Sequence, residues 1–181
     1  MDKLPEIIKF YDVPNQSEWV EVVLAFDPET KEYKIYKDKK LEHHTTNKQF
    51  VAKLSMTEPT IKKESKTIEV RKEEGFECKI SVNGRGLDMA KADQRQKYDF
   101  WKINLFEGME ATLIYYEVEK KQICWKDRRI SIPRGPIKHP FSLCQKSFEI
   151  ELISKGGVFH TVLKMGGKVI PHFKGREGTS N

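Results

Sequence analysis

The chain has 181 residues, a mass of 21.2 kDa and a net charge of +6, with a mean hydropathy of −0.65. This composition excludes a membrane-spanning stretch, and three scattered cysteines (Cys78, Cys124 and Cys144) exclude a disulfide framework. Isoleucine and valine together number 26, against 10 leucines and 5 alanines. Because branching at Cβ favours pleated sheet over helix, the composition predicts an all-β protein rather than a helical bundle.

Short segments with alternating apolar residues follow one another through the first half of the chain. In one of them Cys78, Ile80 and Val82 share a face while Lys79 and Ser81 lie on the other, which is typical of a half-buried antiparallel strand. Asn83-Gly84 then supplies a hairpin turn. The predicted strands of this half are 6–13, 19–26, 33–37, 49–56, 66–71 and 76–82.

The same pattern resumes after a polar segment at residues 86–97 (GLDMAKADQRQK), which indicates a short helix or a connector. Residues 132–140 contain three prolines and predict a long loop. The tail from Lys174 onward has almost nothing to bury, so we expect it to be disordered. The predicted strands of this half are 100–105, 111–118, 121–125, 147–153 and 158–165.

Three segments of the first half recur in the second half in the same order, which favours an internal duplication over chance. The matches are YKDKKL (36–41) with WKDRRI (125–130), residues 68–70 with 150–152, and FECKISVNGRGL (76–87) with FHTVLKMGGKVI (159–170).

The repeat and the spacing of the strands together predict the domain organisation. We expect two consecutive antiparallel β-sandwich-like domains, with at most one short helix. The N-terminal domain is predicted to cover residues 1–97, and the C-terminal domain residues 98–181 with its disordered tail.

The sequence contains no catalytic signature, so we predict a protein that is not an enzyme and has no catalytic residues, cofactor or metal. The adjacent His43 and His44 would point to opposite faces of a strand, and a solvated loop is the favoured interpretation. The glycines of NGRGL (83–87) lack the spacing and the following helix of a phosphate-binding loop, and a hairpin turn explains them more simply.

The excess positive charge lies in the second half, where residues 98–181 contain 14 basic and 9 acidic residues. A basic cluster attracts phosphates, so an alternative function is binding of nucleic acid or phosphorylated partners through residues 126–138. A solvated, charged edge strand explains the same residues without any ligand. The candidate interaction patch consists of Lys126, Arg128, Arg129, Arg134 and Lys138.

In order along the chain, several of these segments resemble the Fas apoptotic inhibitory molecule family, and the likeness spans essentially the whole sequence. The chain is similar to a diverged member, because Lys126-Asp127-Arg128 replaces a family Asn-Gly turn. The similar segments are Tyr11-Asp12-Val13, YKDKK (36–40), KQFVAKL (48–54), Gly75-Phe76, ISVNGRGL (80–87), Trp101 and HTVLKMGGKVIP (160–171).

The resemblance implies a non-enzymatic cytoplasmic regulator that dampens death-receptor apoptosis or protects against protein aggregation. Its partners would be signalling proteins or misfolded clients, without membrane insertion, and no catalytic residues carry over. For clients, we expect exposed strand edges to pair with unfolding chains by β-augmentation. The lack of a positively charged leader followed by an apolar run also favours a cytoplasmic location with reduced thiols.

Overall fold

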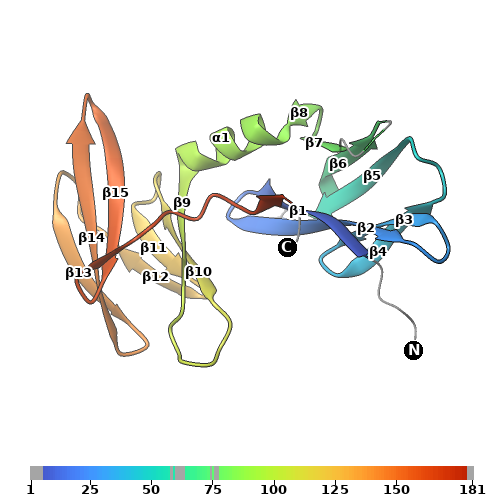
Figure 1. Ribbon diagram of the computed structural model, residues 1–181. Coiled ribbons are helices and arrows are strands. Elements are labelled where there is room, and N and C mark those ends of the chain that lie inside the picture. Colours follow the sequence, from blue (N-terminus) through green and yellow to red (C-terminus); the bar gives the residue numbers. More distant parts are fainter. Residues whose placement is uncertain (1–5, 58, 60–63, 74, 76–77, 179–181) are drawn as a thin grey trace. The chain divides into compact units, whose positions relative to one another are not determined.

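The computed structural model describes residues 6–57, 59, 64–73, 75 and 78–178 (Figure 1). The chain divides into two units. Unit 1 consists of residues 1–94 together with the C-terminal segment from Gly175, and unit 2 is Arg95–Lys174. This division lies within the single described helix, α1 (Leu87–Lys97), and our predicted domain boundary after residue 97 lies at the end of the same helix.

Unit 1 contains two antiparallel sheets that each follow the chain as a meander. The strands are β1 (Glu6–Asn15), β2 (Glu18–Asp27), β3 (Glu32–Lys37), β4 (Lys40–Thr45), β5 (Phe50–Thr57), β6 (Glu64–Lys72), β7 (Cys78–Val82), β8 (Arg85–Gly86) and β17 (Glu177–Gly178). One sheet has the order β17-β1-β2-β3-β4, and the other has the order β5-β6-β7-β8.

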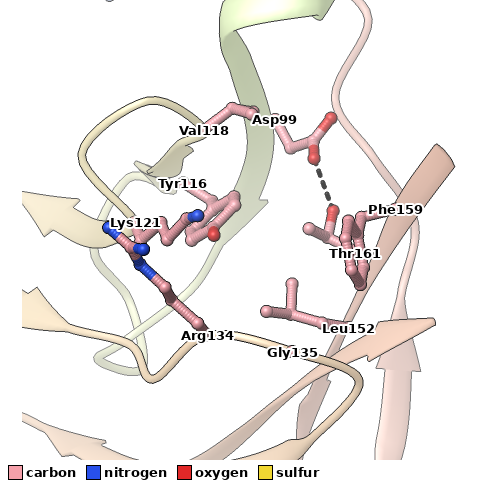
Figure 2. A pocket seen from close by; sticks show the side chains of 9 residues that line it. All are labelled: Asp99, Tyr116, Val118, Lys121, Arg134, Gly135, Leu152, Phe159 and Thr161. Carbon is pink, nitrogen blue, oxygen red and sulfur yellow. Dashed lines mark hydrogen bonds between the residues drawn. The ribbon is translucent and has the colours of Figure 1, made fainter. Parts of the chain in front are cut away.

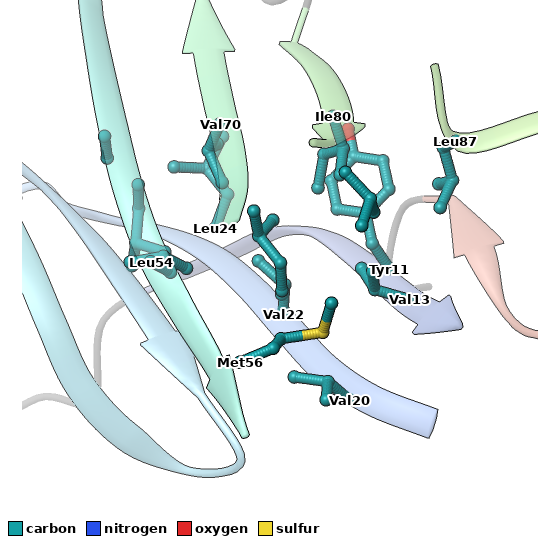
Figure 3. Close-up of a cluster of buried hydrophobic side chains, with 14 of the residues drawn as sticks. Tyr11, Val13, Val20, Val22, Leu24, Leu54, Met56, Val70, Ile80 and Leu87 are labelled. Atoms are coloured by element: carbon teal, nitrogen blue, oxygen red, sulfur yellow. The ribbon is translucent and has the colours of Figure 1, made fainter. Parts of the chain in front are cut away.

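The core of unit 1 contains apolar residues from both sheets. Figure 3 shows Val22 and Leu24 of β2 facing Leu54 and Met56 of β5, and all four are nearly or completely buried. Residues alternate between exposed and buried along β5, as expected for a strand with one face against a core. Leu87, the first residue of α1, joins the same cluster and connects the helix to this unit.

Unit 2 repeats this architecture with eight strands. They are β9 (Tyr98–Ile103), β10 (Thr112–Glu117), β11 (Gln122–Trp125), β12 (Arg128–Ser131), β13 (Lys138–Leu143), β14 (Lys146–Lys155), β15 (Val158–Met165) and β16 (Lys168–Ile170). The sheets have the orders β12-β11-β10-β9 and β13-β14-β15-β16. Their core includes the fully buried Trp101, Ile114, Ile150 and Leu163.

The prediction of an all-β fold with two antiparallel β-sandwich-like domains and one short helix is confirmed. Each unit contains one four-stranded meander followed by a second, so β1–β8 correspond in order to β9–β16. All three recurring sequence segments lie on corresponding strands. This shared topology is the arrangement that an internal duplication produces.

The hairpin turns show how closely the repeat is kept. Asn83-Gly84 and Gly166-Gly167 connect corresponding strands, and all four residues have positive φ angles between 47° and 79°. A turn of this kind needs residues that tolerate the left-handed region, which favours asparagine and glycine. This hairpin coincides residue for residue with the match of 76–87 to 159–170, of which Phe76 and Glu77 lie outside the described residues.

The other two sequence matches fall on corresponding strands but are slightly out of register. In the YKDKKL match Lys37 aligns with Lys126, yet the turn begins after Lys37 in one hairpin and after Trp125 in the other. The β3–β4 pair also contains a register irregularity between Ile35 and Tyr36, close to this turn. The repeat is therefore kept in the order of β1–β8 and β9–β16 but is approximate in sequence, because bulges and turns absorb shifts of one or two residues.

Several local predictions were wrong because short edge strands carry little apolar alternation. His43 and His44 lie on β4 rather than in a loop; His43 packs near the Phe50 ring and His44 lies near Glu32. The predicted loop 132–140 is shorter, since β13 begins at Lys138. We expect all three cysteines in strands, but Cys144 lies in the β13–β14 turn, with a φ of 47°.

The prediction of a disordered tail was wrong for residues up to 178. Glu177–Gly178 forms β17 against β1, and the Arg176 guanidinium donates to both carboxylate oxygens of Asp12 at 3.0 and 3.1 Å. The Arg176 backbone N–H also donates to Asp12, at 2.7 Å, and its side chain donates to Glu21, at 2.7 Å. These carboxylates raise the pKa of Arg176 and hold the end of the chain on the β1 edge.

In the part of the chain that the structure describes, no helix is both long and apolar enough to cross a lipid bilayer.

The Arg176→Ala variant should lower the free energy of unfolding, because the nearly buried Asp12 carboxylate would lose its charged donors. We expect a loss of about 1–3 kcal/mol in urea unfolding. Lys174→Ala, at an exposed neighbouring position, should change the free energy of unfolding by less than about 0.5 kcal/mol. Equal stability of the two variants would show that the tail is not fixed by this ion pair.

Candidate functional site

The basic residues predicted as one interaction patch belong to three local environments. Lys126, Arg128 and Arg129 lie on the β11–β12 hairpin, where the Arg129 guanidinium donates to the carbonyls of the other two residues at 2.7 and 3.0 Å. The Lys126 ammonium lies 4.9 Å from the centre of the Trp125 ring. Two of the three long cations are therefore already engaged by their own hairpin.

Arg134 and Lys138 lie on the segment that follows this hairpin. Lys138, on β13, is 4.0 Å from the Glu151 carboxylate of the adjacent β14. Arg134 is exposed in the β12–β13 loop and lines a pocket of about 100 Å³. Of the five predicted residues, Arg134 lines this cavity, and Lys138 lines a second described cavity of the unit, of about 500 Å³, together with Glu151.

This cavity, which we call the end pocket, opens at one end of the sandwich of unit 2. Its walls come from the strands β9, β10, β14 and β15 and from the β10–β11 and β12–β13 loops, so both sheets contribute. The lining residues are Asp99, Tyr116, Val118, Lys121, Arg134, Gly135, Leu152, Phe159 and Thr161 (Figure 2).

One wall of the end pocket is a short hydrogen-bonded network. The Thr161 hydroxyl donates to the Asp99 carboxylate at 2.6 Å and lies 3.1 Å from His172 Nε2. The His172 ring in turn packs 5.1 Å from the ring of Trp101, which is fully buried. The wall is thus fixed to the core of the unit.

This network does not have the geometry of a nucleophilic catalytic site. In a catalytic triad the imidazole lies between the carboxylate and the hydroxyl and accepts the hydroxyl proton. Here the Thr161 hydroxyl donates its hydrogen bond to Asp99, and His172 Nε2 is a second neighbour of the same hydroxyl oxygen. These hydrogen bonds fix the side chains of this wall of the pocket, and they do not activate the Thr161 hydroxyl as a nucleophile.

The floor and rim of the end pocket are apolar. Leu152 is almost completely buried at the base, whereas Val118 and Phe159 are 41% and 55% exposed at the rim. Burial, with a smaller contribution from Asp99, raises the pKa of the buried Tyr116 phenol. The phenol therefore stays neutral over the physiological range and adds an uncharged polar group to the apolar surface of the pocket.

Two cations lie on the side opposite the Asp99–Thr161 pair, as Figure 2 shows for Lys121 and Arg134. Among the described residues neither has a carboxylate within 4.0 Å, since no ion pair includes them. Lys121 ends the β10–β11 loop with a φ of 52°, as Lys31 ends the corresponding loop of unit 1 with a φ of 57°. The Ile132 N–H donates to the Lys121 carbonyl at 2.8 Å and joins the two cationic loops.

The size of the end pocket decides what it can hold. Sites for drug-sized molecules and cofactors usually have volumes of roughly 300–1,000 Å³. A cavity of about 100 Å³ is well below that range and suits a single side chain of medium size. Within the described ranges, no group of three or more His, Cys, Asp or Glu side chains is placed to hold a metal ion.

Strand edges are the other surface that could bind an extended partner, and three of them carry features that oppose pairing. The edge strand β12 begins with Arg128 and Arg129, and the edge strand β13 contains Lys138 and Pro140. Charged residues and proline on an edge are common protection against unwanted strand addition. The β1 edge is covered by β17 over Phe10 and Tyr11. These three edges are therefore poorly suited to β-augmentation, and the end pocket is the better candidate for binding a partner through one side chain.

Sequence reasoning found Arg134 but missed the rest of the end pocket. Val118 and Phe159 are the last and second residues of predicted strands, where alternation cannot distinguish a core position from a rim position. Asp99, Lys121 and Thr161 come from different sheets and a loop, and the packing of the two sheets brings them together. A Gly-Gly turn followed by two adjacent apolar residues, Val158 and Phe159, was the available local signal of an exposed apolar tip.

Comparisons of the chain with protein-family models, with curated proteins and with solved structures each find no match. The resemblance to the Fas apoptotic inhibitory molecule family therefore rests on the sequence motifs alone and stays a prediction.

The raised pKa of Tyr116 gives a prediction for alkaline pH. The folded state holds the phenol proton more tightly than the unfolded chain does, so this contribution to stability is lost as the pH rises above the ordinary tyrosine value of 10.0. In urea unfolding across this range, Tyr116→Phe should lose less stability than the unmodified protein. Parallel pH profiles for the two proteins would contradict this assignment.

Proposed function

We propose that the protein is a binding module that acts on protein partners through the end pocket of unit 2, without catalysis. The observation that carries the proposal is the combination of a side-chain-sized apolar cavity with two cations at its rim. Such a site suits one apolar anchor residue flanked by carboxylates. Interfaces commonly depend on a few anchors of this type in small pockets.

The chemistry of the rim supports an acidic partner segment. Lys121 and Arg134 line the same pocket as the exposed Val118 and Phe159, so an apolar contact and a charge contact can form together. Asp99, which accepts the Thr161 hydrogen bond, lies on the side of the pocket opposite the two cations, so partner carboxylates would bind at the cationic side and away from it. Charge complementarity would steer the partner and orient it, while apolar burial would supply most of the affinity.

The biological role that fits this binding activity is the one implied by the family resemblance. A regulator that dampens death-receptor signalling, or that protects against aggregation, acts by holding segments of other proteins. The apolar rim and the cations of the end pocket would hold such segments from signalling partners or misfolded clients. The duplicated all-β scaffold supports this role by presenting a pocket on rigid strands and short loops.

The alternative is binding of nucleic acid or phosphorylated partners through residues 126–138. The observation in its favour is the β11–β12 hairpin, where Lys126 lies over the Trp125 ring and Arg128 is exposed. Phosphate binding of this kind would weaken steeply with salt. The experiment below therefore includes a variant of this hairpin.

An acidic peptide with a single methionine or leucine should bind the full-length protein in a calorimetric titration. Phe159→Ser and Arg134→Glu should each weaken binding about tenfold, because they remove the apolar rim and reverse a rim charge. Two matched variants serve as controls: Val158→Ser alters an exposed neighbour outside the pocket, and Arg128→Glu alters the β11–β12 hairpin.

The outcomes separate the two functions. Loss of binding in the pocket variants with near-normal binding in the controls would support the proposal. Loss in Arg128→Glu alone, with strong salt dependence and binding of a phosphorylated peptide, would favour the alternative. If pocket binding is also the basis of aggregation protection, Phe159→Ser should fail to slow light scattering by a heat-aggregating client that the Val158→Ser protein still protects.

A further inference from the structure

The loop between β9 and β10 is an exposed segment of unit 2 with an unusual composition. Within residues 104–111 (NLFEGMEA), Phe106 is 48% exposed and Met109 is 66% exposed. Glu110 directly follows Met109, and Glu107 precedes it with Gly108 in between; both glutamates are exposed. Neither glutamate takes part in an ion pair with a described residue.

The chemistry of this loop is the complement of the end pocket. The pocket provides an apolar space with Lys121 and Arg134 beside it, and the loop provides an exposed thioether with a carboxylate on each side. Methionine is unbranched and polarizable, so it fills small irregular pockets and contacts aromatic rings favourably. Tyr116 and Phe159 supply such rings at the end pocket.

The loop cannot reach the end pocket of its own unit. Asp99 and Tyr116 are paired across β9 and β10 at the pocket end of this hairpin, whereas Ile103 pairs with Thr112 at the loop end. Ile103 is four residue steps along the strand from Asp99, or about 13 Å at 3.3 Å per residue. Figure 1 shows the loop projecting from the far end of the β9–β10 hairpin. The occupant must therefore come from another molecule.

We propose that the end pocket of one molecule binds the β9–β10 loop of a second copy of this chain, with Met109 as the anchor. Glu107 and Glu110 then face Lys121 and Arg134 of the first copy. This inference rests on the proposed function of the end pocket and adds its regulation: self-association occupies the same pocket that takes an external partner, so the two compete.

The positions of the loop and the pocket define the assemblies that can form. Two molecules whose β9–β10 hairpins run antiparallel can exchange loops and close as a symmetric dimer. Head-to-tail contact instead leaves one free loop and one free pocket and allows further growth. Both assemblies use the same contact, so the same substitutions must weaken either one.

Sedimentation velocity of the full-length protein tests this contact. The average mass should rise with protein concentration, and Met109→Ser and Glu110→Lys should each raise the dissociation constant about tenfold. Val169→Ser, which removes a similarly exposed apolar side chain on β16, should leave the dissociation constant unchanged. Arg134→Glu should also weaken association, and combining it with Glu110→Arg should restore it, since the charges are exchanged across the contact.

The remaining outcomes each have a definite meaning. A monomer at all concentrations, or association that is insensitive to Met109→Ser and Glu110→Lys, would overturn the inference. If a monomeric protein still binds the acidic methionine peptide through Phe159 and Arg134, the proposed function stands without self-association. If neither the peptide nor a second copy binds, both proposals fail. A synthetic peptide of residues 104–111 should displace the self-associated form and thus tests the loop without altering the fold.

Discussion

Every sheet in this protein has one apolar face that must be covered, and the chain meets this requirement twice in the same way. A meander of four strands cannot bury its own face, so a second meander packs on it and the core forms between the two layers. Val70 and Ile80 form a buried cross-strand pair in unit 1, and Ile150 and Leu163 form the corresponding pair in unit 2. Covering the faces leaves the ends of each sandwich open, and the end pocket lies at such an end.

Comparison of the two units distinguishes the turn geometry that both share from the side chains that line the end pocket of unit 2. The loops that end in Lys31 and Lys121 have the same length and the same left-handed final residue. In unit 2 the Lys121 carbonyl accepts a hydrogen bond from Ile132, and the loop that follows presents Arg134. The turn geometry that both units share thus positions the backbone, and the side chains of Lys121 and Arg134 form the cationic rim of the end pocket in unit 2.

The sequence allowed prediction of those features that depend on neighbouring residues. Alternation around Ile80 placed β7, and Asn83-Gly84 placed its hairpin, because a two-residue turn and a two-residue period are local properties. The contact between Asp12 and Arg176 could not be predicted in this way, since 164 residues separate the partners. The tail looked disordered because it buries almost no apolar surface, yet a charged pair and two strand residues suffice to fix it.

The end pocket lay beyond sequence reasoning for the same reason. Arg134 was singled out by charge alone, together with Lys126 and Arg129, whose side chains engage their own hairpin instead. Nothing in the local sequence relates Arg134 to Phe159 or Thr161. Strand pairing brings these residues together, so their shared role emerges only from the folded topology.

The most direct test of the account is a map of backbone amide chemical shifts as an acidic methionine peptide is added to the full-length protein. If the end pocket is the binding site, the largest changes fall on the β10–β11 loop, the β12–β13 loop and the start of β15, around Lys121, Arg134 and Phe159. Changes centred on the β11–β12 hairpin, or confined to unit 1, would contradict the assignment of the end pocket as the binding site.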